Sequence, residues 1–288
     1  MNRFTHFAAI DWSGAAGPRQ KGIAIAACRL GTPAPELVRP GHVWSRLEVL
    51  HWLLGLEGDW LIGMDLSPSL AFADHGAFFP GWNQSPADAP GLWALVEAIA
   101  TDEPHLGANS FVDHPEASRH FRRHGGRCGD LFPAGAGRFR VVEDVSRDQG
   151  LCNPYSNFNL VGAAQVGKSS LTGMRLFHRL AGRLPIWPYD PVPVQGPVVV
   201  EIYTSIAATA AGLPKSRTKV RDAGTLDRVL TAFDSAPHAP LTRYDDHATD
   251  AILAAAWLRT VAHDAQYWRP QQLTAKLART EGWTFGVR

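Results

Sequence analysis

Acidic side chains stand late in three apolar runs of the chain. Asp11 ends the run FAAID, Asp65 ends WLIGMD, and Glu201 follows PVVV. An acid at the end of a buried strand is costly unless a metal ion, a ribose or a backbone donor binds it. Neighbouring strands lie about 5 Å apart, and open α/β sheets place their sites at one end of the strands. If the three runs are parallel neighbours, we expect their acids to meet there.

A late helical pattern adds acids to the same end of the sheet. The segment 245–265, DDHATDAILAAAWLRTVAHDA, is predicted to form a helix with one partly acidic face. That face contains Asp246, Asp250, Ala254, Trp257 and Val261. Because the later part of the face is apolar, we expect the helix to pack on the sheet and to direct its two acids toward the strand acids.

Several carboxylates in one place indicate divalent-metal chemistry. Four or five of them cannot all be ionised and close together without a cation, since like charges raise each other's pKa. Ligation by carboxylate oxygens is the preference of Mg²⁺ and Mn²⁺. Two such ions about 3.5–4 Å apart can hold a phosphodiester, generate hydroxide and stabilise the leaving oxygen. The predicted reaction is metal-dependent hydrolysis of a phosphodiester by an activated water.

Each acid also has an ordinary local role. Asp11 can cap the turn that follows it, and Asp65 precedes Leu-Ser-Pro-Ser, where an Asx-turn is a competing interpretation. Asp245 and Asp246 begin the predicted helix, where capping and the helix dipole favour an acid. Glu201 is harder to explain in this way, because an acid among valines inside a strand needs a partner.

The elements that would position these acids are visible as apolar patterns. A helix is predicted at 45–56, beginning with a capping box formed by Ser45 and Glu48. Residues 68–196 are rich in Pro, Gly, His, Trp and Asn, and we interpret them as an insertion or cap. It contains helical patterns at 91–100 and 170–182. The predicted strands are 6–14, 22–30, 36–44, 60–67 and 197–205. The predicted α/β core comprises residues 1–67 and 197–288.

Composition narrows the class of protein. The chain of 288 residues is 45% hydrophobic and 19% charged, so it can bury an ordinary core. Its net charge of +1 excludes a grossly basic nucleic-acid binder but permits local basic patches. Three distant cysteines without a CxxC pair disfavour a zinc ribbon or a disulfide framework. Without a signal-like start or a run of transmembrane length, we expect a cytoplasmic protein with no membrane contact; the sequence leaves the oligomeric state open.

The acid-bearing segments resemble a known family. AAIDWSG, GMDLSPSL, VEIYTS followed by the basic KSRTK, and DDHATDAILAAAW resemble motifs of the ribonuclease H-like superfamily. More narrowly, the chain resembles the domain-of-unknown-function 429 family, whose members are predicted ribonuclease H-like nucleases. The resemblance implies a five-stranded mixed sheet flanked by helices and a large insertion between its fourth and fifth strands. It also implies nuclease chemistry with Mg²⁺ or Mn²⁺, so that nucleic acid is the expected substrate. It assigns metal roles to Asp11, Asp65, Glu201 and Asp250; Asp246 is a further catalytic candidate.

Three lysines are candidates for contacts with a substrate phosphate. Lys215 or Lys219, in the basic segment after the last strand, would stabilise charge that develops on the phosphate. Lys168 belongs to GAAQVGKS (162–169), which matches the P-loop pattern GxxxxGK[ST]. The segment before it is a poor buried strand and no Walker-B acid follows at a natural distance, so we favour a chance match. Lys168 remains a candidate for holding a phosphate at a helix start.

Other functions stay open. Sugar kinases and actin-like ATPases also begin with a strand that ends in Asp before a phosphate-binding hairpin, although a second hairpin and an adenosine motif are not convincing here. The GAAQVGKS loop would serve a nucleotide-binding protein, and a non-catalytic module that binds metal or nucleotide is a third alternative. His120 and His124 have the spacing of zinc ligands on a helix, but no third ligand is obvious, and we expect surface histidines.

Overall fold

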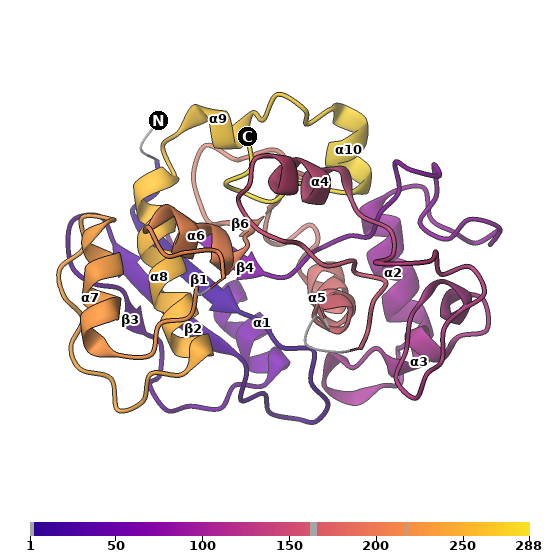
Figure 1. Cartoon of the computed structure of the whole chain (residues 1–288), viewed down its shortest axis with the longest axis horizontal. Helices are drawn as coiled ribbons and strands as arrows, with labels where there is room; N and C mark the ends of the chain where they lie inside the picture. The colour runs from indigo at the N-terminus through magenta and orange to yellow at the C-terminus, as the bar shows by residue number, and fades with distance from the viewer. Residues whose placement is uncertain (1–2, 162–165, 217) are drawn as a thin grey trace.

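A mixed β-sheet forms the centre of the protein (Figure 1). The computed structural model describes residues 3–161, 166–216 and 218–288. Within these residues six strands pair in the order β3-β2-β1-β4-β6-β5. β2 is antiparallel to β1 and β3, whereas β1, β4, β6 and β5 are parallel. The strands are β1 (His6–Asp11), β2 (Ala24–Arg29), β3 (Glu36–Leu37), β4 (Trp60–Asp65), β5 (Ile186–Trp187) and β6 (Val198–Glu201).

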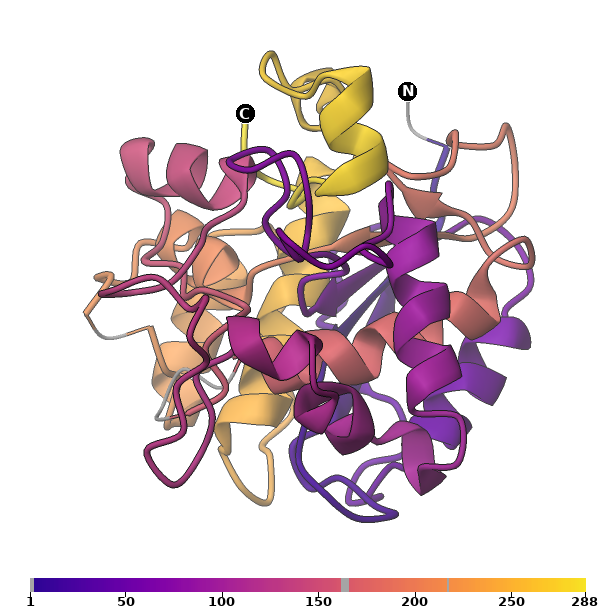
Figure 2. The same ribbon diagram turned by 90° about the vertical axis from the view of Figure 1, so that its right-hand side faces the viewer.

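Helices cover both faces of the sheet (Figures 1 and 2). Along β1, Ala8 and Ile10 join one hydrophobic core, whereas Phe7 and Ala9 join the other, as expected of alternating side chains. The first core includes residues of α1 (Arg46–Leu54), α2 (Ala89–Ile99) and α5 (Val166–Leu180). The second includes residues of α6 (Thr204–Ala210), α7 (Ala223–Thr231) and α8 (Asp246–Val261). The parallel strands are therefore buried on both faces.

Short segments complete the chain around these two layers. They are η1 (Pro104–Leu106), α3 (Asn109–Asp113), η2 (Ala117–His120), α4 (Val141–Asp148), α9 (Ala265–Trp268) and α10 (Ala275–Thr280). Among the residues that the structure describes, no helix has the length and apolar character needed to span a bilayer.

The elements with strong local signals are confirmed. The predicted order of three strands, a helix and a fourth strand corresponds to β1, β2, β3, α1 and β4. The capping box is also present: the Ser45 hydroxyl accepts a hydrogen bond from the Glu48 amide at 3.1 Å, and the Glu48 carboxylate accepts one from the Ser45 amide at 2.7 Å. The helix predicted at 245–265 is α8, and the Asp245 side chain caps it by accepting from the Ala248 amide at 3.0 Å.

The sheet differs from the prediction at its two edges. It has six strands in the described residues, not five, because β5 pairs with β6 at one edge. At the other edge, the strand predicted over 36–44 is reduced to the two residues of β3. A strand of two residues carries no alternation that a sequence pattern can reveal. The segment 68–196, predicted as an insertion or cap, thus supplies both an edge strand and the helix α5 of one covering layer.

His120 is a buried residue, which corrects the expectation of a surface histidine. Its exposed fraction is 3%, its ring packs edge-on against Phe79 at a centroid distance of 5.4 Å, and its Nε2 has no hydrogen-bond partner among the described residues. Burial, together with the guanidinium groups of Arg138 and Arg119, lowers the pKa of His120 to about 4. His124 is exposed, so the pair does not form a zinc-binding face.

We expect the His120→Phe substitution to remove part of the acid sensitivity of the folded state. A histidine whose pKa is lowered by folding contributes stability that is complete above its unfolded pKa and is lost as the pH falls toward its folded pKa. From about pH 7 to pH 5, the wild type should lose about 2 kcal/mol more unfolding free energy than the variant. Urea unfolding at both pH values measures the difference. His124→Phe is the control, and equal losses in wild type and His120→Phe would contradict the prediction.

Candidate active site

Two of the predicted acids lie directly opposite each other on neighbouring parallel strands. The last residue of β1, Asp11, is the register partner of the last residue of β4, Asp65. Ala9 and Leu61, two and four residues before these acids on the same strands, belong to the hydrophobic core on the α8 side of the sheet. Because side chains alternate along a strand, Asp11 and Asp65 point to that side as well. At Gly63 a Cβ would lie only 2.7 Å from Leu258 of α8, so this helix packs directly on β4.

The third acid, Asp250, comes from α8, as its position on the packed helical face predicted. It is buried, with an exposed fraction of 6%, and forms an ion pair with Lys219. Asp65 accepts a hydrogen bond from the Thr204 hydroxyl at 3.0 Å. The apolar part of α8 along the sheet therefore fixes the carboxylate of its first turns beside the ends of β1 and β4.

The three carboxylates act on one another electrostatically. Burial, followed by repulsion from Asp11 and Asp250, raises the pKa of Asp65 to about 8. Burial also raises the pKa of Asp250 to about 6, although Lys219 opposes the shift, and it raises the pKa of Asp11 against the effect of His247. Burial disfavours the charged form of Lys219, but Asp250 outweighs it and the pKa of the lysine is raised. All three acids therefore hold their protons more tightly than free aspartates do, and the two basic neighbours do not reverse these shifts.

His247 is part of this cluster and was not predicted. Its Nδ1 lies 2.9 Å from the Asp11 carboxylate, and this hydrogen bond raises the pKa of the imidazole. The signal was present in DDHATD, since a histidine three residues before Asp250 lies on the same side of a helix. The hydrogen bond between Nδ1 and Asp11 fixes the orientation of the imidazole ring. Because Nδ1 is engaged in this bond, Nε2 is the nitrogen that can exchange a proton.

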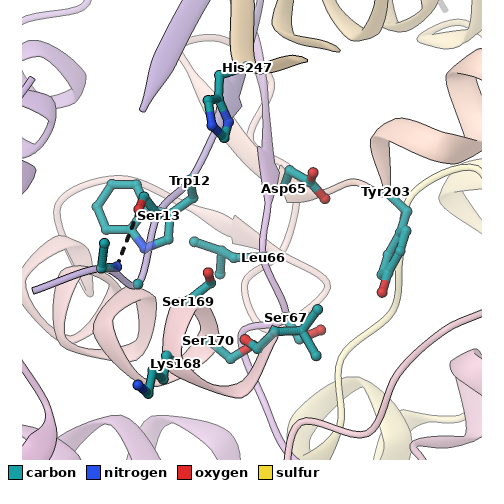
Figure 3. A pocket seen from close by; sticks show the side chains of 13 residues that line it. Trp12, Ser13, Asp65, Leu66, Ser67, Lys168, Ser169, Ser170, Tyr203 and His247 are labelled. Carbon is teal, nitrogen blue, oxygen red and sulfur yellow. Dashed lines mark hydrogen bonds between the residues drawn. The ribbon is translucent and has the colours of Figure 1, made fainter. Parts of the chain in front are cut away.

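A cavity of about 380 Å³ opens beside the cluster. Asp65 and His247 line it, whereas Asp11, which is hydrogen-bonded to His247, is not among the lining residues. Lys168 lies on the side opposite His247, and Trp12 and Tyr203 flank the space (Figure 3). We call this space, lined by Asp65, His247, Lys168, Trp12 and Tyr203 among others, the carboxylate cavity.

The loop after β1 brings α5 to the carboxylate cavity. A Cβ on Gly14 would lie 2.4 Å from the Ser169 amide nitrogen, a distance that real side chains do not adopt, so glycine is required for this close approach. The consequence is that Lys168, in the first turn of α5, lines the same cavity as Asp65, with its nitrogen end directed away from that acid (Figure 3). Residues 162–165 of the GAAQVGKS match lie outside the described residues, and only the lysine and the serines after it can be placed.

Glu201 does not join the three aspartates. It is paired with Met64, one residue before Asp65, and alternation along β6 therefore directs its side chain to the opposite face of the sheet. There it is fully buried against Arg140, whose Nη1 donates to Glu201 Oε2 at 2.9 Å. The Thr284 hydroxyl donates to the other oxygen at 2.8 Å. The partner that a strand-interior glutamate requires is an arginine, and the structure gives no support to Glu201 as a metal ligand.

The remaining candidates lie at the margin of the site. Asp246 is half-buried and accepts a hydrogen bond from Arg221 at 3.0 Å, and its charge acts on Asp11 and Asp250. Lys215 is exposed and lies against Gly150, where a Cβ would be 2.8 Å from its Nζ, away from the carboxylate cavity. Of the two lysines proposed after the last strand, Lys219 is the one beside the acids.

The donor set of the cluster fits Mg²⁺ or Mn²⁺, but the carboxylates are held by other partners. Asp11, Asp65 and Asp250 offer the oxygen ligands that these ions prefer. Among the described residues, no three acidic, histidine or cysteine side chains are already arranged as ligands of one ion. The carboxylates of Asp11 and Asp250 would have to exchange their contacts with His247 and Lys219 for the metal.

Comparison of the chain with protein-family models, with curated proteins and with solved structures gives no match. The functional argument therefore depends on the geometry and electrostatics of the carboxylate cavity.

Proposed function

We propose that the protein is a divalent-metal-dependent phosphodiester hydrolase whose substrate is a nucleic acid. The observation that carries the proposal is the convergence of Asp11, Asp65 and Asp250 from three separate elements at the end of the parallel strands. Keeping three carboxylates buried together costs free energy through desolvation and repulsion. Such a cost is typical of a functional site, where a bound cation offsets it.

The residues of the cluster have distinct parts in this proposal. Asp11, Asp65 and Asp250 would hold Mg²⁺ or Mn²⁺, which supplies positive charge for the phosphate and acidifies a bound water. His247, oriented through Nδ1 by Asp11, accepts a proton at Nε2 on the side of the cavity. Lys168 binds a phosphate oxygen from the opposite wall, and Lys219 offsets negative charge beside Asp250.

Cleavage of a labelled substrate panel tests the proposal. The panel contains single strands, duplexes, RNA–DNA hybrids and branched DNA, each incubated with Mn²⁺ or with EDTA. Cleavage in Mn²⁺ that EDTA abolishes supports the proposal and identifies the substrate form. Absence of Mn²⁺-dependent cleavage across the panel, together with ATP turnover that Lys168→Ala removes, would instead support a nucleotide-binding enzyme.

We also expect Mn²⁺ to stabilise the folded protein through the three aspartates. At a free Mn²⁺ concentration of about 100 Kd, binding adds about 2.7 kcal/mol, which raises the Tm by about 4–5 °C for a chain of this size. Asp65→Asn should lose most of the shift, because it removes a ligand that lines the cavity. Differential scanning calorimetry with and without Mn²⁺ measures each shift.

Glu201→Gln is the matched control for this measurement. It makes the same carboxylate-to-amide change on the strand next to β4, but on the opposite face of the sheet. Its Tm without metal should be lower than that of the wild type, while its Mn²⁺-induced shift should be intact. Equal shifts in Asp65→Asn and the wild type would count against metal binding by the aspartates.

A further inference from the structure

A second cavity lies next to the carboxylate cavity. Its volume is about 600 Å³, and it is bounded by β2, by the loop 38–44 and by the segment 241–248 that leads into α8. Ile23, Ile25 and Val38 are among the apolar side chains that line it. We call this cavity the β2–α8 groove. None of the residues that line only this groove takes part in the hydrolysis proposed above.

The groove combines an apolar floor with a basic rim. Lys21, Arg39 and Arg243 line it and are all exposed. The Arg39 guanidinium lies over the ring of Trp44 at 5.0 Å from its centroid, which presents a flat cationic surface. The acid in its lining, Asp245, already accepts a hydrogen bond from the Ala248 amide. An apolar floor with cations around it suits a ligand that has a flat apolar body and negative charge.

The groove and the carboxylate cavity share one wall. His247 lines both of them. At Gly22 a Cβ would lie 3.2 Å from the Ser13 hydroxyl oxygen and 3.3 Å from His247 Cε1, so the backbone before β2 lies against both side chains. The two cavities therefore lie on either side of His247.

We propose that the β2–α8 groove binds the nucleotide next to the scissile phosphate of a single-stranded nucleic acid. The inference rests on the proposed function, because that function places a phosphodiester on the other side of His247. The base packs on the apolar floor against the Arg39 guanidinium, and Lys21 and Arg243 contact the adjoining phosphates. The strand is single, because a base face that packs on protein is not available inside a duplex.

Binding measured without divalent metal tests the groove independently of cleavage. The probe is a fluorescein-labelled oligothymidylate of about 12 nucleotides, titrated with protein in EDTA at salt concentrations from about 50 to 200 mM. The Arg39→Gln/Arg243→Gln double variant should bind about tenfold more weakly. Its plot of log affinity against log salt should be shallower by about 0.7, which corresponds to the one phosphate contact of Arg243 that is lost on a single strand. Lys21→Glu is a second variant at an exposed position and should also weaken binding.

The matched control removes the same charge elsewhere. Arg183→Gln/Arg228→Gln changes two exposed arginines outside the groove and should bind like the wild type. Equal losses in the two double variants would show a general effect of net charge and overturn the inference, as would unchanged binding by both groove variants. Duplex DNA that binds as tightly as the single strand would overturn it too. If Mn²⁺-dependent cleavage is absent but groove-dependent binding is found, the failure lies in the proposed hydrolysis and not in the groove.

Discussion

Asp11→Asn is expected to lower the kcat of Mn²⁺-dependent phosphodiester cleavage by at least about a thousandfold. The substitution keeps the shape of the side chain but removes its charge from the centre of the cluster. Asp11 faces Asp65 in register and orients His247 at 2.9 Å. One change therefore removes one of the proposed metal ligands and the charged partner of His247, the proposed proton acceptor.

The experiment separates loss of chemistry from loss of folding. Because the neutral side chain relieves repulsion with Asp65, Asp11→Asn should unfold in urea at a concentration no lower than the wild type. Asp102→Asn, which changes an exposed acid outside the cluster, is the matched control and should retain wild-type activity. A variant that keeps more than about a tenth of the wild-type kcat would show that the cleavage does not depend on this cluster or comes from a contaminating nuclease.

The acids whose meeting at one end of the sheet follows from the sequence are those whose position depends on local patterns. Asp11 and Asp65 both end apolar runs, and parallel pairing alone brings such ends together. Asp250 follows from the helical period of the segment that became α8. Glu201 also stands near the end of an apolar run. The face of the sheet to which its side chain points depends, however, on the pairing register of β6 with β4, which the sequence does not reveal. Glu201 pairs with Met64 and not with Asp65, which is the next residue of β4. This shift of one residue directs the Glu201 side chain to the face of the sheet opposite that of Asp65.

The contacts that the sequence could not predict join distant segments. Arg140 lies 61 residues before Glu201 in a region without a strong pattern, and nothing local marks it as the partner. The same is true of Lys219 and Asp250, which are 31 residues apart and meet because the chain returns along α8. His247 differs, since its spacing to Asp250 in DDHATD places it on the same side of the helix as that acid.

Arg140→Met is expected to cost about 4 kcal/mol or more of unfolding free energy. Arg140 is fully buried and joins three parts of the chain. Its Nη1 donates to Glu201 of β6 at 2.9 Å and to the Glu281 carbonyl at 3.0 Å, Nη2 donates to the Ser67 hydroxyl at 3.0 Å, and Nε donates to Glu143 at 3.0 Å. Methionine would fill much of the space but leave two buried carboxylates without their cation.

The pH dependence of this loss distinguishes uncompensated charge from poor packing. Burial already raises the pKa of Glu143 to about 7 although Arg140 opposes the shift, and removing the arginine raises it further. An acid whose pKa is raised by folding is most favourable below its unfolded pKa, and the stability is lost as the pH rises through the folded value. Urea unfolding should therefore show a larger deficit for Arg140→Met at about pH 8 than at about pH 5.

Two further variants make this interpretation falsifiable. Arg140→Met/Glu201→Met should regain part of the lost stability, because apolar side chains of similar volume can replace a buried ion pair. Arg147→Met, at an exposed arginine of α4, should lie within about 0.5 kcal/mol of the wild type. If the double variant is no more stable than Arg140→Met, and the deficit is the same at both pH values, packing is the cause. In that case the arginine is not the charge partner that stabilises Glu201 and Glu143 in the interior.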